Sequence, residues 1–474
     1  MKGLKLTIAT LLLVLLPQIH TGQALSKPVA EYVALADSVV AIRNVTLIDG
    51  TGGSVKPHQD IVLANRRIAA IGESGKVVIP RNAKILDGTG KTVIPGLIML
   101  HEHLFYAKPF NGKYKGTHMT NTFPQLYLAG GVTTMRTAGS LEASSDLNLK
   151  NLIESGQWVG PTMDVSTPHV ERLGFIPQLQ SLYGDENIED WLTYWFNKGI
   201  TSVKVYNQIT RADLKEIIRV AHARNIKVTG HLCSITYREA AELGIDNLEH
   251  SFMAATDFVA GKPEDTCVSG GASLRELDAD HPELLALMQL LIDKGVTLTY
   301  TPTVFEPFTG REVVPGGGSE ALAPYLLEQM QEIYAQSANT EWDSLRLVSF
   351  QKEMQRVRKF HALGGKVVVG TDPTGSGKTI AGYANQRMIE LLVETGFSIE
   401  EAIKLATLNG AEYLEIDTET GTVEVGKEAD LVLISGDLSQ DVSRIRHMEL
   451  VFKDGVGFDS GKIFNSIKGT VGLY

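Results

Sequence analysis

The chain places ionisable side chains at the ends of short apolar runs that are spread over more than half of its length. The runs are VIPGLIML-HEH, SVKVY, KVTGH, NLEH and KVVVGTD. The side chains in question are four histidines, one lysine and one aspartate: His101, His103, Lys204, His231, His250 and Asp372. If each run is a strand and all the strands point into one pocket, these six positions supply the ligands of a two-metal site.

The N-terminal residues have the pattern of a secretory signal peptide. Lys2 and Lys5 precede an apolar stretch over residues 6–16, and GQA at 22–24 has the small-x-small form of a cleavage site. The stretch is shorter than the roughly 20 apolar residues that span a bilayer. We therefore expect residues 1–24 to be removed near Ala24 and the mature protein to be secreted or periplasmic, without stable membrane insertion. The alternative is an uncleaved membrane anchor.

Charge and cysteine content limit the partners of the mature chain. The net charge is −11, and loss of the two lysines of the signal makes it −13, which argues against binding nucleic acid or an anionic membrane. Cys233 and Cys267 are the only cysteines, so no disulfide framework supports the fold. They could form one bridge in an oxidising compartment, but for Cys233 a packed thiol is the favoured interpretation. The oligomeric state is open, and a homo-oligomer is compatible with the sequence.

Both ends of the mature chain predict β-structure. Residues 38–94 alternate short apolar runs with turns such as DGTGG, and GTVEVGKEADLVLISGD and MELVFKDG repeat this style near the C-terminus. Each flank is too small to bury a core alone. We expect residues 38–94 and 417–460 to pair into one composite β-sandwich.

The central segment, residues 95–416, alternates strands with helices. Helical patterns fill most of the intervals, for example at 212–224, 235–243, 282–294 and 341–363. A long insertion at 306–340 interrupts the alternation, and such insertions often contact substrate. The expected strands are 94–103, 131–136, 162–167, 201–206, 227–232, 246–251, 296–302 and 366–372. Eight strands alternating with helices predict an α/β fold with a (β/α)8 TIM-like barrel.

Strand geometry sharpens the metal hypothesis. Side chains alternate along a strand, so His101 and His103 point the same way while Glu102 points to the other face. Lys204 lies between two valines, and a lysine aimed into a barrel must be paired or lose its charge. One interpretation is a structural ion pair with a buried acid. The other is a neutral amine that takes up carbon dioxide and becomes an anionic carbamate that bridges two metals.

The ordered set PGLIMLHEH, SVKVY, TGH, LEH and GTD, followed by EVGKEADLVL, resembles the amidohydrolase superfamily. More narrowly it is similar to the imidazolonepropionase-like branch that includes metal-dependent prolidases. The resemblance spans roughly residues 40–455. It implies that His101, His103 and Asp372 bind the more buried metal, that His231 and His250 bind the second, and that Lys204, as N6-carboxylysine, bridges both.

The resemblance also implies a mechanism in which a bridging hydroxide is the nucleophile and Asp372 shuttles the proton to the leaving nitrogen. Two divalent ions are expected. Zinc is favoured because imidazole nitrogen suits it, although the ligand set also accepts manganese, cobalt or iron.

The sequence indicates the type of reaction more clearly than the substrate. Arg136 is followed by Thr137 where many relatives have an aspartate, and Gln386 stands where a histidine is common, which leaves the substrate open. His169 and Tyr206 are candidate substrate contacts, with rim packing as the alternative. We expect an enzyme that cleaves a C–N bond in a small amide, such as a dipeptide or an N-acyl amino acid. The alternatives are a one-metal cyclic amidase of the imidazolonepropionase type and a catalytically silent binding protein.

Overall fold

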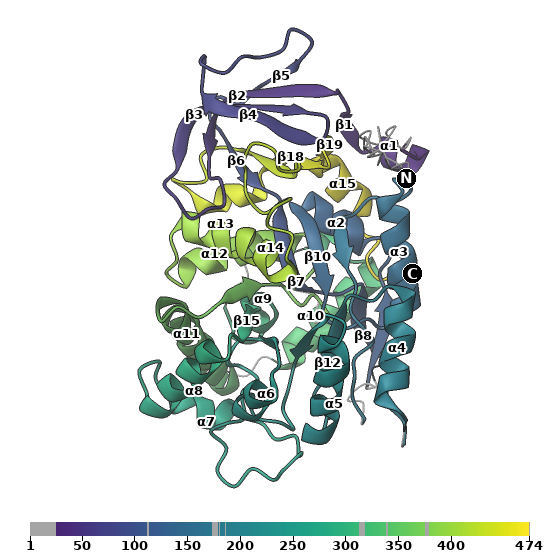
Figure 1. The fold of residues 1–474 in the computed structure, drawn as a ribbon, viewed down its shortest axis with the longest axis vertical. Coiled ribbons are helices and arrows are strands. Elements are labelled where there is room, and N and C mark those ends of the chain that lie inside the picture. Colours follow the sequence, from purple (N-terminus) through teal and green to yellow (C-terminus); the bar gives the residue numbers. More distant parts are fainter. Residues whose placement is uncertain are drawn as a thin grey trace, which may run out of the picture.

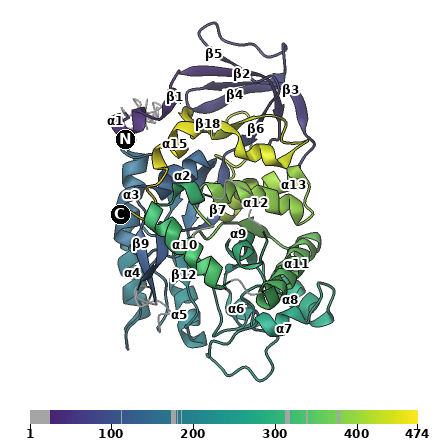
Figure 2. The same ribbon diagram turned by 180° about the vertical axis from the view of Figure 1, so that it is seen from behind.

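A computed structural model describes residues 25–473, apart from 111–112, 173–178, 180, 185, 312–317, 338–339 and 375–378. The expected signal peptide, residues 1–24, lies outside the described residues. Strands from the N-terminal part of the chain form one end of the molecule, and the helices and strands of its middle part form the rest (Figure 1). The C-terminal strands and α15 (Ser460–Ile467) lie between these two parts (Figure 2).

All eight strands expected in the central segment are present. They are β7 (Leu97–Glu102), β10 (Val132–Thr137), β11 (Thr162–Asp164), β12 (Ser202–Val205), β13 (Lys227–Gly230), β14 (Asn247–Glu249), β15 (Thr297–Tyr300) and β16 (Val367–Val369). They form two parallel sheets, with the orders β11-β10-β7 and β12-β13-β14-β15-β16. The strands are shorter than expected, so that His103, His231, His250 and Asp372 lie just after the last strand residue, whereas His101 and Lys204 lie within β7 and β12.

Backbone contacts join the two sheets at both edges. Parallel bridges pair Ser166 with Ser202 and Val170 with Val205, next to β11 and β12. At the other edge, the N–H groups of Thr371 and Asp372 donate to the His101 carbonyl at 3.2 and 2.9 Å. β16 therefore lies directly against β7. The carboxyl ends of the strands on both sides of this junction carry expected ligands.

Helices follow most of these strands, as the sequence patterns predict. The described helices are α1 (Lys27–Ala30), α2 (Phe123–Ala129), α3 (Ala143–Glu154), α4 (Ile188–Lys198), α5 (Arg211–His222), α6 (Tyr237–Leu243), α7 (Gly271–Arg275), α8 (Pro282–Asp293), α9 (Pro302–Phe305), α10 (Pro324–Ser337), α11 (Thr340–Ala362), α12 (Tyr383–Glu394), α13 (Ile399–Leu405), α14 (Leu408–Leu414) and α15. Local capping explains several starts. Thr236 and Glu239 form a reciprocal capping box at the start of α6, and Ser398 and Glu401 form another at α13. The 306–340 insertion, of which 312–317 and 338–339 are not described, contains α10.

The two chain ends meet in one nine-stranded sheet. Its strands are β1 (Val33–Leu35), β2 (Val39–Leu47), β3 (Lys56–Ala64), β4 (Arg67–Glu73), β5 (Lys84–Asp87), β6 (Lys91–Pro95), β17 (Leu431–Ser435), β18 (Met448–Lys453) and β19 (Val456–Asp459). β6 pairs antiparallel with β17, which joins the N-terminal and C-terminal strands. Only Gly96 separates β6 from β7, and a Cβ there would lie 2.2 Å from Thr133 Oγ1. The glycine thus lets the small sheet run directly into the first central strand. A further pair, β8 (Phe105–Phe110) and β9 (Lys113–His118), forms a separate hairpin after His103.

The sequence interpretation of Cys233 as a packed free thiol is wrong. Cys233 and Cys267 are joined by a disulfide, with Cα atoms 4.6 Å apart. The reason is tertiary, because the segment after β14 folds back over the segment after β13. The Thr256 hydroxyl approaches the Cys233 carbonyl at 3.4 Å, and the Lys262 ammonium donates to the Ser234 carbonyl.

None of the helices in the described part of the chain combines the length and apolar character that a membrane-spanning helix requires.

Candidate metal centre

The structure brings five of the six expected ligands into one contact network at the carboxyl ends of the strands. His103 Nε2 lies 3.2 Å from Asp372 Oδ1, and His101 Nε2 lies 3.7 Å from Asp372 Oδ2. His250 Nε2 lies 3.9 Å from the same Asp372 oxygen and 3.1 Å from His231 Nδ1. We call His101, His103, His231, His250 and Asp372 the histidine cluster. One potential ligand atom each from His101, His250 and Asp372 lies within 4.8 Å of the others, a spacing that a single ion can bridge.

Burial sets the protonation of the cluster. It lowers the pKa of His101 to about 4 and that of His250 to about 3, and it holds the pKa of His231 well below its ordinary value. Burial by itself would raise the pKa of Asp372, but His101 and His103 hold it well below the usual range. Near neutral pH His101, His231 and His250 are therefore neutral imidazoles, and Asp372 is an ionised carboxylate. These are the forms that bind divalent metals.

Hydrogen bonds fix the orientation of three rings. His101 Nδ1 contacts Glu249 Oε2 at 2.7 Å, His103 Nδ1 donates to the Gly139 carbonyl at 3.2 Å, and His250 Nδ1 contacts the Thr301 hydroxyl at 2.7 Å. In each case Nε2 is directed into the cluster. Metal-binding histidines in proteins are held by this kind of contact through their second ring nitrogen.

Lys204, the sixth expected ligand, reaches the cluster through Glu249. Its ammonium is 3.6 Å from Glu249 Oε1, its side chain is 1% exposed, and Nζ makes no hydrogen bond to any described residue. Burial lowers the pKa of Lys204, although Glu249 opposes this effect. A buried amine without a hydrogen-bond partner is costly unless something else occupies its surroundings. The donor set therefore fits a divalent metal centre, and Lys204 has an amine without a hydrogen-bond partner among the described residues, as a bridging group would need.

Glu249 has hydrogen-bond and ion-pair partners besides Lys204. Arg136 Nη2 donates to Glu249 Oε1 at 2.9 Å, and the Thr229 hydroxyl donates to the same oxygen. Arg136 itself is fully buried and also donates from Nε to the Leu100 carbonyl. Glu249 is thus the buried acid that the ion-pair interpretation of Lys204 requires. Arg136, however, is closer to Glu249 than Lys204 is.

Backbone strain marks two of the cluster positions. His250 has φ +65° and Asp372 has φ +50°, and Ser251 beside His250 has φ +52°. Non-glycine residues rarely adopt this left-handed region, and such strain concentrates at functional sites. The turn at His250 also breaks strand alternation, so that Glu249 and His250 both reach the cluster.

The expected alternation in β7 is confirmed. Glu102 lies on the other face, where its carboxylate accepts from the Thr371 N–H at 3.1 Å, from the Thr371 hydroxyl at 2.5 Å and from Asn385 Nδ2 at 3.1 Å. Burial raises the pKa of Glu102 to about 8. These bonds tie the end of β7 to the segment that carries Asp372.

The two candidate substrate contacts line the cluster. The His169 ring centroid lies 5.9 Å from that of His103 and 4.8 Å from that of Tyr206, and Tyr206 lies 5.1 Å from His231. His169 Nδ1 is buried and has no hydrogen-bond partner among the described residues. A Cβ at Gly139, where φ is +105°, would lie 2.4 Å from the His169 ring, so only glycine permits this placement.

Sequence reasoning did not assign a role to Glu249, Arg136 or Thr301. Glu249 directly precedes His250, so its position was visible, but regular alternation would have placed it on the opposite face. Thr301 directly follows β15, a position that corresponds to those of expected ligands after other strands. This position is the only local indication of a role for Thr301 in the sequence.

A second group of acidic residues lies far from the histidine cluster, beside the small sheet. Ligand atoms of Glu428, Asp430 and Asp454 lie within 4.8 Å of one another. We call these residues the acidic cluster. Lys453 Nζ is 2.9 Å from Asp454 Oδ1 and 3.8 Å from Asp430 Oδ2, and Arg66 pairs with Asp454 at 2.8 Å. Burial raises the pKa of both Glu428 and Asp430.

Comparison with known proteins identifies the family. The model of the amidohydrolase family matches residues 92–458, so the chain belongs to the amidohydrolase family. The resemblance inferred from the sequence is thereby confirmed. The matched region contains the whole histidine cluster and Lys204.

The matches to individual curated proteins cover only short segments of the chain. The chain is 37% identical over 84 residues to a 5-methylthioadenosine/S-adenosylhomocysteine deaminase of Moorella thermoacetica, which is 16% of this chain and 20% of that protein. It is 55% identical over 40 residues to an imidazolonepropionase of Picrophilus torridus, which is 8% of this chain and 10% of that protein. The matches thus span a fifth or less of these curated relatives.

Solved structures share the fold over most of the chain. A protein of Bifidobacterium longum proposed to be a prolidase has a TM-score of 0.65 and 23% identity, covering 91% of this chain and 100% of the other. A Xaa-Pro dipeptidase with bound methionine has a TM-score of 0.64 and 20% identity, covering 89% and 100%. At these identities the likeness establishes the mixed α/β fold and no more.

Proposed function

We propose that this protein is an exported, binuclear metal-dependent hydrolase that cleaves the C–N bond of a small amide, such as a dipeptide or an N-acyl amino acid. In this proposal residues 95–416 form a closed (β/α)8 barrel. Residues 38–94 and 417–460 form the composite β-sandwich beside it. The parallel order of the eight strands and the contacts between β16 and β7 support the barrel.

The observation that carries the proposal is the convergence of the strand ends on one buried set of four imidazoles and an ionised aspartate. His101, His103 and Asp372 would hold one ion and His231 and His250 the other, with carboxylated Lys204 between them. When bound, such ions acidify water and polarise the amide carbonyl. Zinc suits the imidazole-rich set.

The side chains around the cluster have distinct tasks. The Asp372 carboxylate is ionised and lies next to the histidines, so it can accept a proton from the attacking water and deliver it to the leaving nitrogen. The His169 and Tyr206 rings lie beside the cluster and can orient the substrate. Glu249 holds the His101 ring in place. Together these groups supply the proton transfer and positioning that amide hydrolysis requires.

The test is an assay of purified protein against a library of dipeptides and N-acyl amino acids, before and after treatment with a chelator. We expect hydrolysis of a subset of the library, its loss with the chelator and its recovery when zinc is added back. Hydrolysis that persists at full rate in chelator would overturn the metal-dependent proposal.

One observation favours a second candidate, a cyclic amidase of the imidazolonepropionase type that uses one metal. In that case Lys204 would be a structural partner of Glu249, from which it is 3.6 Å distant. The binuclear proposal is preferred because Arg136 already pairs with Glu249 at shorter range.

Export is the remaining part of the proposal. The pattern of residues 1–24 supports it, and so does the Cys233–Cys267 bridge, since disulfides form and persist in oxidising compartments. The mature protein from the native host is expected to begin near Leu25. Recovery of a chain that begins at Met1 in the membrane fraction would contradict export.

A further inference from the structure

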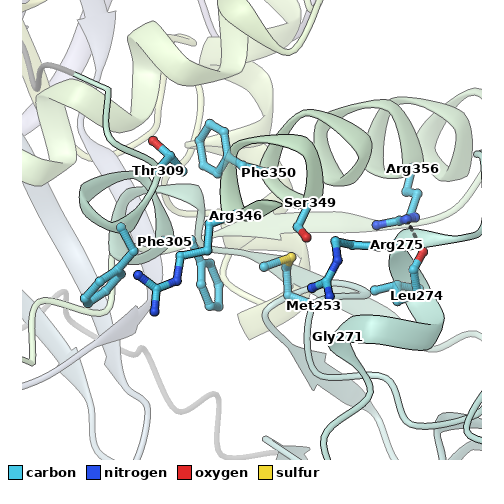
Figure 3. Close-up of a pocket in the computed structure, with 11 residues that line it drawn as sticks. Met253, Gly271, Leu274, Arg275, Phe305, Thr309, Arg346, Ser349, Phe350 and Arg356 are labelled. Atoms are coloured by element: carbon cyan, nitrogen blue, oxygen red, sulfur yellow. Dashed lines mark hydrogen bonds between the residues drawn. The ribbon is translucent and has the colours of Figure 1, made fainter. Parts of the chain in front are cut away.

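A cavity of about 320 Å³ adjoins the histidine cluster on the side of β14 and β15. It lies between α11 and the segments that follow these two strands, among them α7 and α9 (Figure 3). A smaller void of about 10 Å³ shares Met253, Phe305 and Phe350 with this cavity and is also lined by His250. The Phe305 ring lies 5.6 Å from the His250 ring. A ligand that fills the cavity would therefore contact the residues that pack directly against a cluster histidine.

Most of the cavity wall is apolar. Phe305, Phe308, Phe350, Leu274 and Met253 contribute three aromatic rings and two aliphatic side chains. The volume lies at the lower end of the range of small-molecule pockets, about 300–1,000 Å³. This space and lining suit one aromatic ring or a group of similar size.

Two arginines give the cavity a positive edge. Arg346 lies over the Phe308 ring at 5.9 Å and forms a long ion pair with Asp343 at 3.9 Å. The Arg275 side chain has no acidic partner among the described residues, and none of the eleven residues that line the cavity is acidic. By contrast, Arg356 on the same wall donates to the Leu274 carbonyl at 2.6 Å and pairs with Glu353.

Such guanidinium groups recognise carboxylates. Arginine presents a planar set of donors that matches a carboxylate, and it also stacks on aromatic rings. The chain carries a net charge of −11, so a cavity whose lining residues include three arginines and no acid departs locally from the charge of the whole molecule. The guanidinium groups would attract an anion that enters here.

We propose that this cavity is a specificity subsite, and that the substrate carries an aromatic-sized apolar group with a carboxylate on one side of its scissile amide bond. This inference rests on the proposed hydrolytic function and names the substrate class of that site. The apolar group would occupy the space beside Phe305 and Phe350, and the carboxylate would pair with an arginine at the cavity edge, Arg275 or Arg346.

The test measures binding of hydrocinnamate and of its neutral amide, hydrocinnamamide, to the metal-loaded protein by calorimetry. The two probes have the same ring and chain length, so their difference reports the charge alone. We expect the carboxylate to bind about tenfold more tightly, as one charge-assisted contact predicts. In the double variant Arg275→Gln/Arg346→Gln both probes should bind with equal affinity. The control variant Arg81→Gln changes an exposed arginine between β4 and β5 and should preserve the difference in affinity.

A second variant tests whether the probes bind in this cavity. Ser349 lies on α11 in the cavity wall, and Ser349→Trp should fill the space and weaken both probes about tenfold or more. Equal affinity of the two probes for the wild type, or a preference that survives the double arginine variant, would overturn the proposal. Full affinity for hydrocinnamate in a folded Ser349→Trp protein would do the same, because the carboxylate would then be bound elsewhere.

Metal content, melting temperature and hydrolysis of the amide library are recorded on the same samples. Absence of metal or of hydrolysis in the wild type would refute the proposed function. Loss of the arginine dependence alone would refute only the subsite.

Discussion

The histidine cluster and the acidic cluster both gather potential metal ligands within 4.8 Å, yet their surroundings differ in one decisive respect. In the histidine cluster burial keeps His101, His231 and His250 neutral. Hydrogen bonds to neighbours hold the Nδ1 atoms of His101, His103 and His250. In the acidic cluster Lys453 and Arg66 already lie within 2.9 Å of Asp454.

The comparison teaches that proximity of ligands does not by itself make a metal site. A metal ion must replace whatever already balances the charge of its ligands, and buried ion pairs are strongly destabilised when one partner is displaced. Neutral imidazoles need no such replacement. We therefore assign the metals to the histidine cluster and regard the acidic cluster as a structural ion-pair network.

The largest expected effect is on turnover. Asp372→Asn removes the proton acceptor and a charged ligand, and kcat/KM should fall by at least about 10²–10⁴-fold because general acid–base catalysis is lost. Steady-state assays on the library substrate with the best activity provide the measurement. Asp454→Asn in the acidic cluster is the matched control and should keep its activity. Comparable losses in both variants would erase the distinction between the two regions.

Lys204→Ala should lose the second metal and nearly all turnover while the fold remains intact. Glu249 keeps Arg136 as a partner, so the melting temperature should change little. Lys204→Arg should fail as well, because guanidinium stays protonated and cannot add carbon dioxide. Short carboxylic acids in solution should restore part of the activity of the alanine variant. Full metal content together with a collapsed melting temperature would instead establish Lys204 as a structural ion-pair member.

Acid should destabilise the metal-free protein through the histidine cluster. The pKa of His101 is lowered from 6.5 to about 4 in the folded state, so the unfolded chain takes up the proton first as the pH falls. Stability is then lost between about pH 6.5 and pH 4, and the lowered pKa of this one residue accounts for about 3 kcal/mol. Denaturant titrations across this range would measure it. His101→Gln should reduce the dependence, of which His231 and His250 retain their share, and the exposed His222→Gln should leave it unchanged.

Glu249→Gln tests whether the contact between Glu249 and His101 orients the His101 ring for metal binding. The amide cannot hold the protonated Nδ1 of His101 as a carboxylate does, so metal affinity should fall about 10–100-fold, as is typical for residues that orient a metal-binding histidine. Competition with a coloured chelator gives the affinity. Unchanged affinity would mean that the contact between His101 and Glu249 is incidental to metal binding.

The smallest effect is expected in the acidic cluster. Glu428→Gln should leave the number of bound metals and their affinity at the wild-type values, because no ion is assigned there. Elemental analysis on the same preparation provides the check. A loss of one ion per chain would move one of the two metals to the small sheet.

Much of this arrangement could be predicted from the sequence because buried parallel strands appear as continuous apolar runs. Each run ends where the strand leaves the sheet, so the residue at its end marks the carboxyl edge. This is why all eight strands, and the convergence of His101, His103, His231, His250 and Asp372, followed from spacing alone.

The remaining features depend on tertiary contacts that leave no local pattern. Glu249 reaches the cluster because the backbone at His250 takes a left-handed turn, whereas regular alternation places it on the opposite face. Cys267 meets Cys233 because the long segment after β14 folds back, and nothing near either cysteine in the sequence indicates the return. The cavity edged by Arg275 and Arg346 likewise combines residues from segments more than sixty positions apart.

The central claim is that the histidine cluster holds two ions, and the most direct test is to count them. Protein saturated with zinc and freed of loose metal should contain close to two ions per chain by elemental analysis. The same measurement on His231→Ala should give close to one. One ion per chain in the saturated wild type, unchanged in His231→Ala, would contradict the binuclear account.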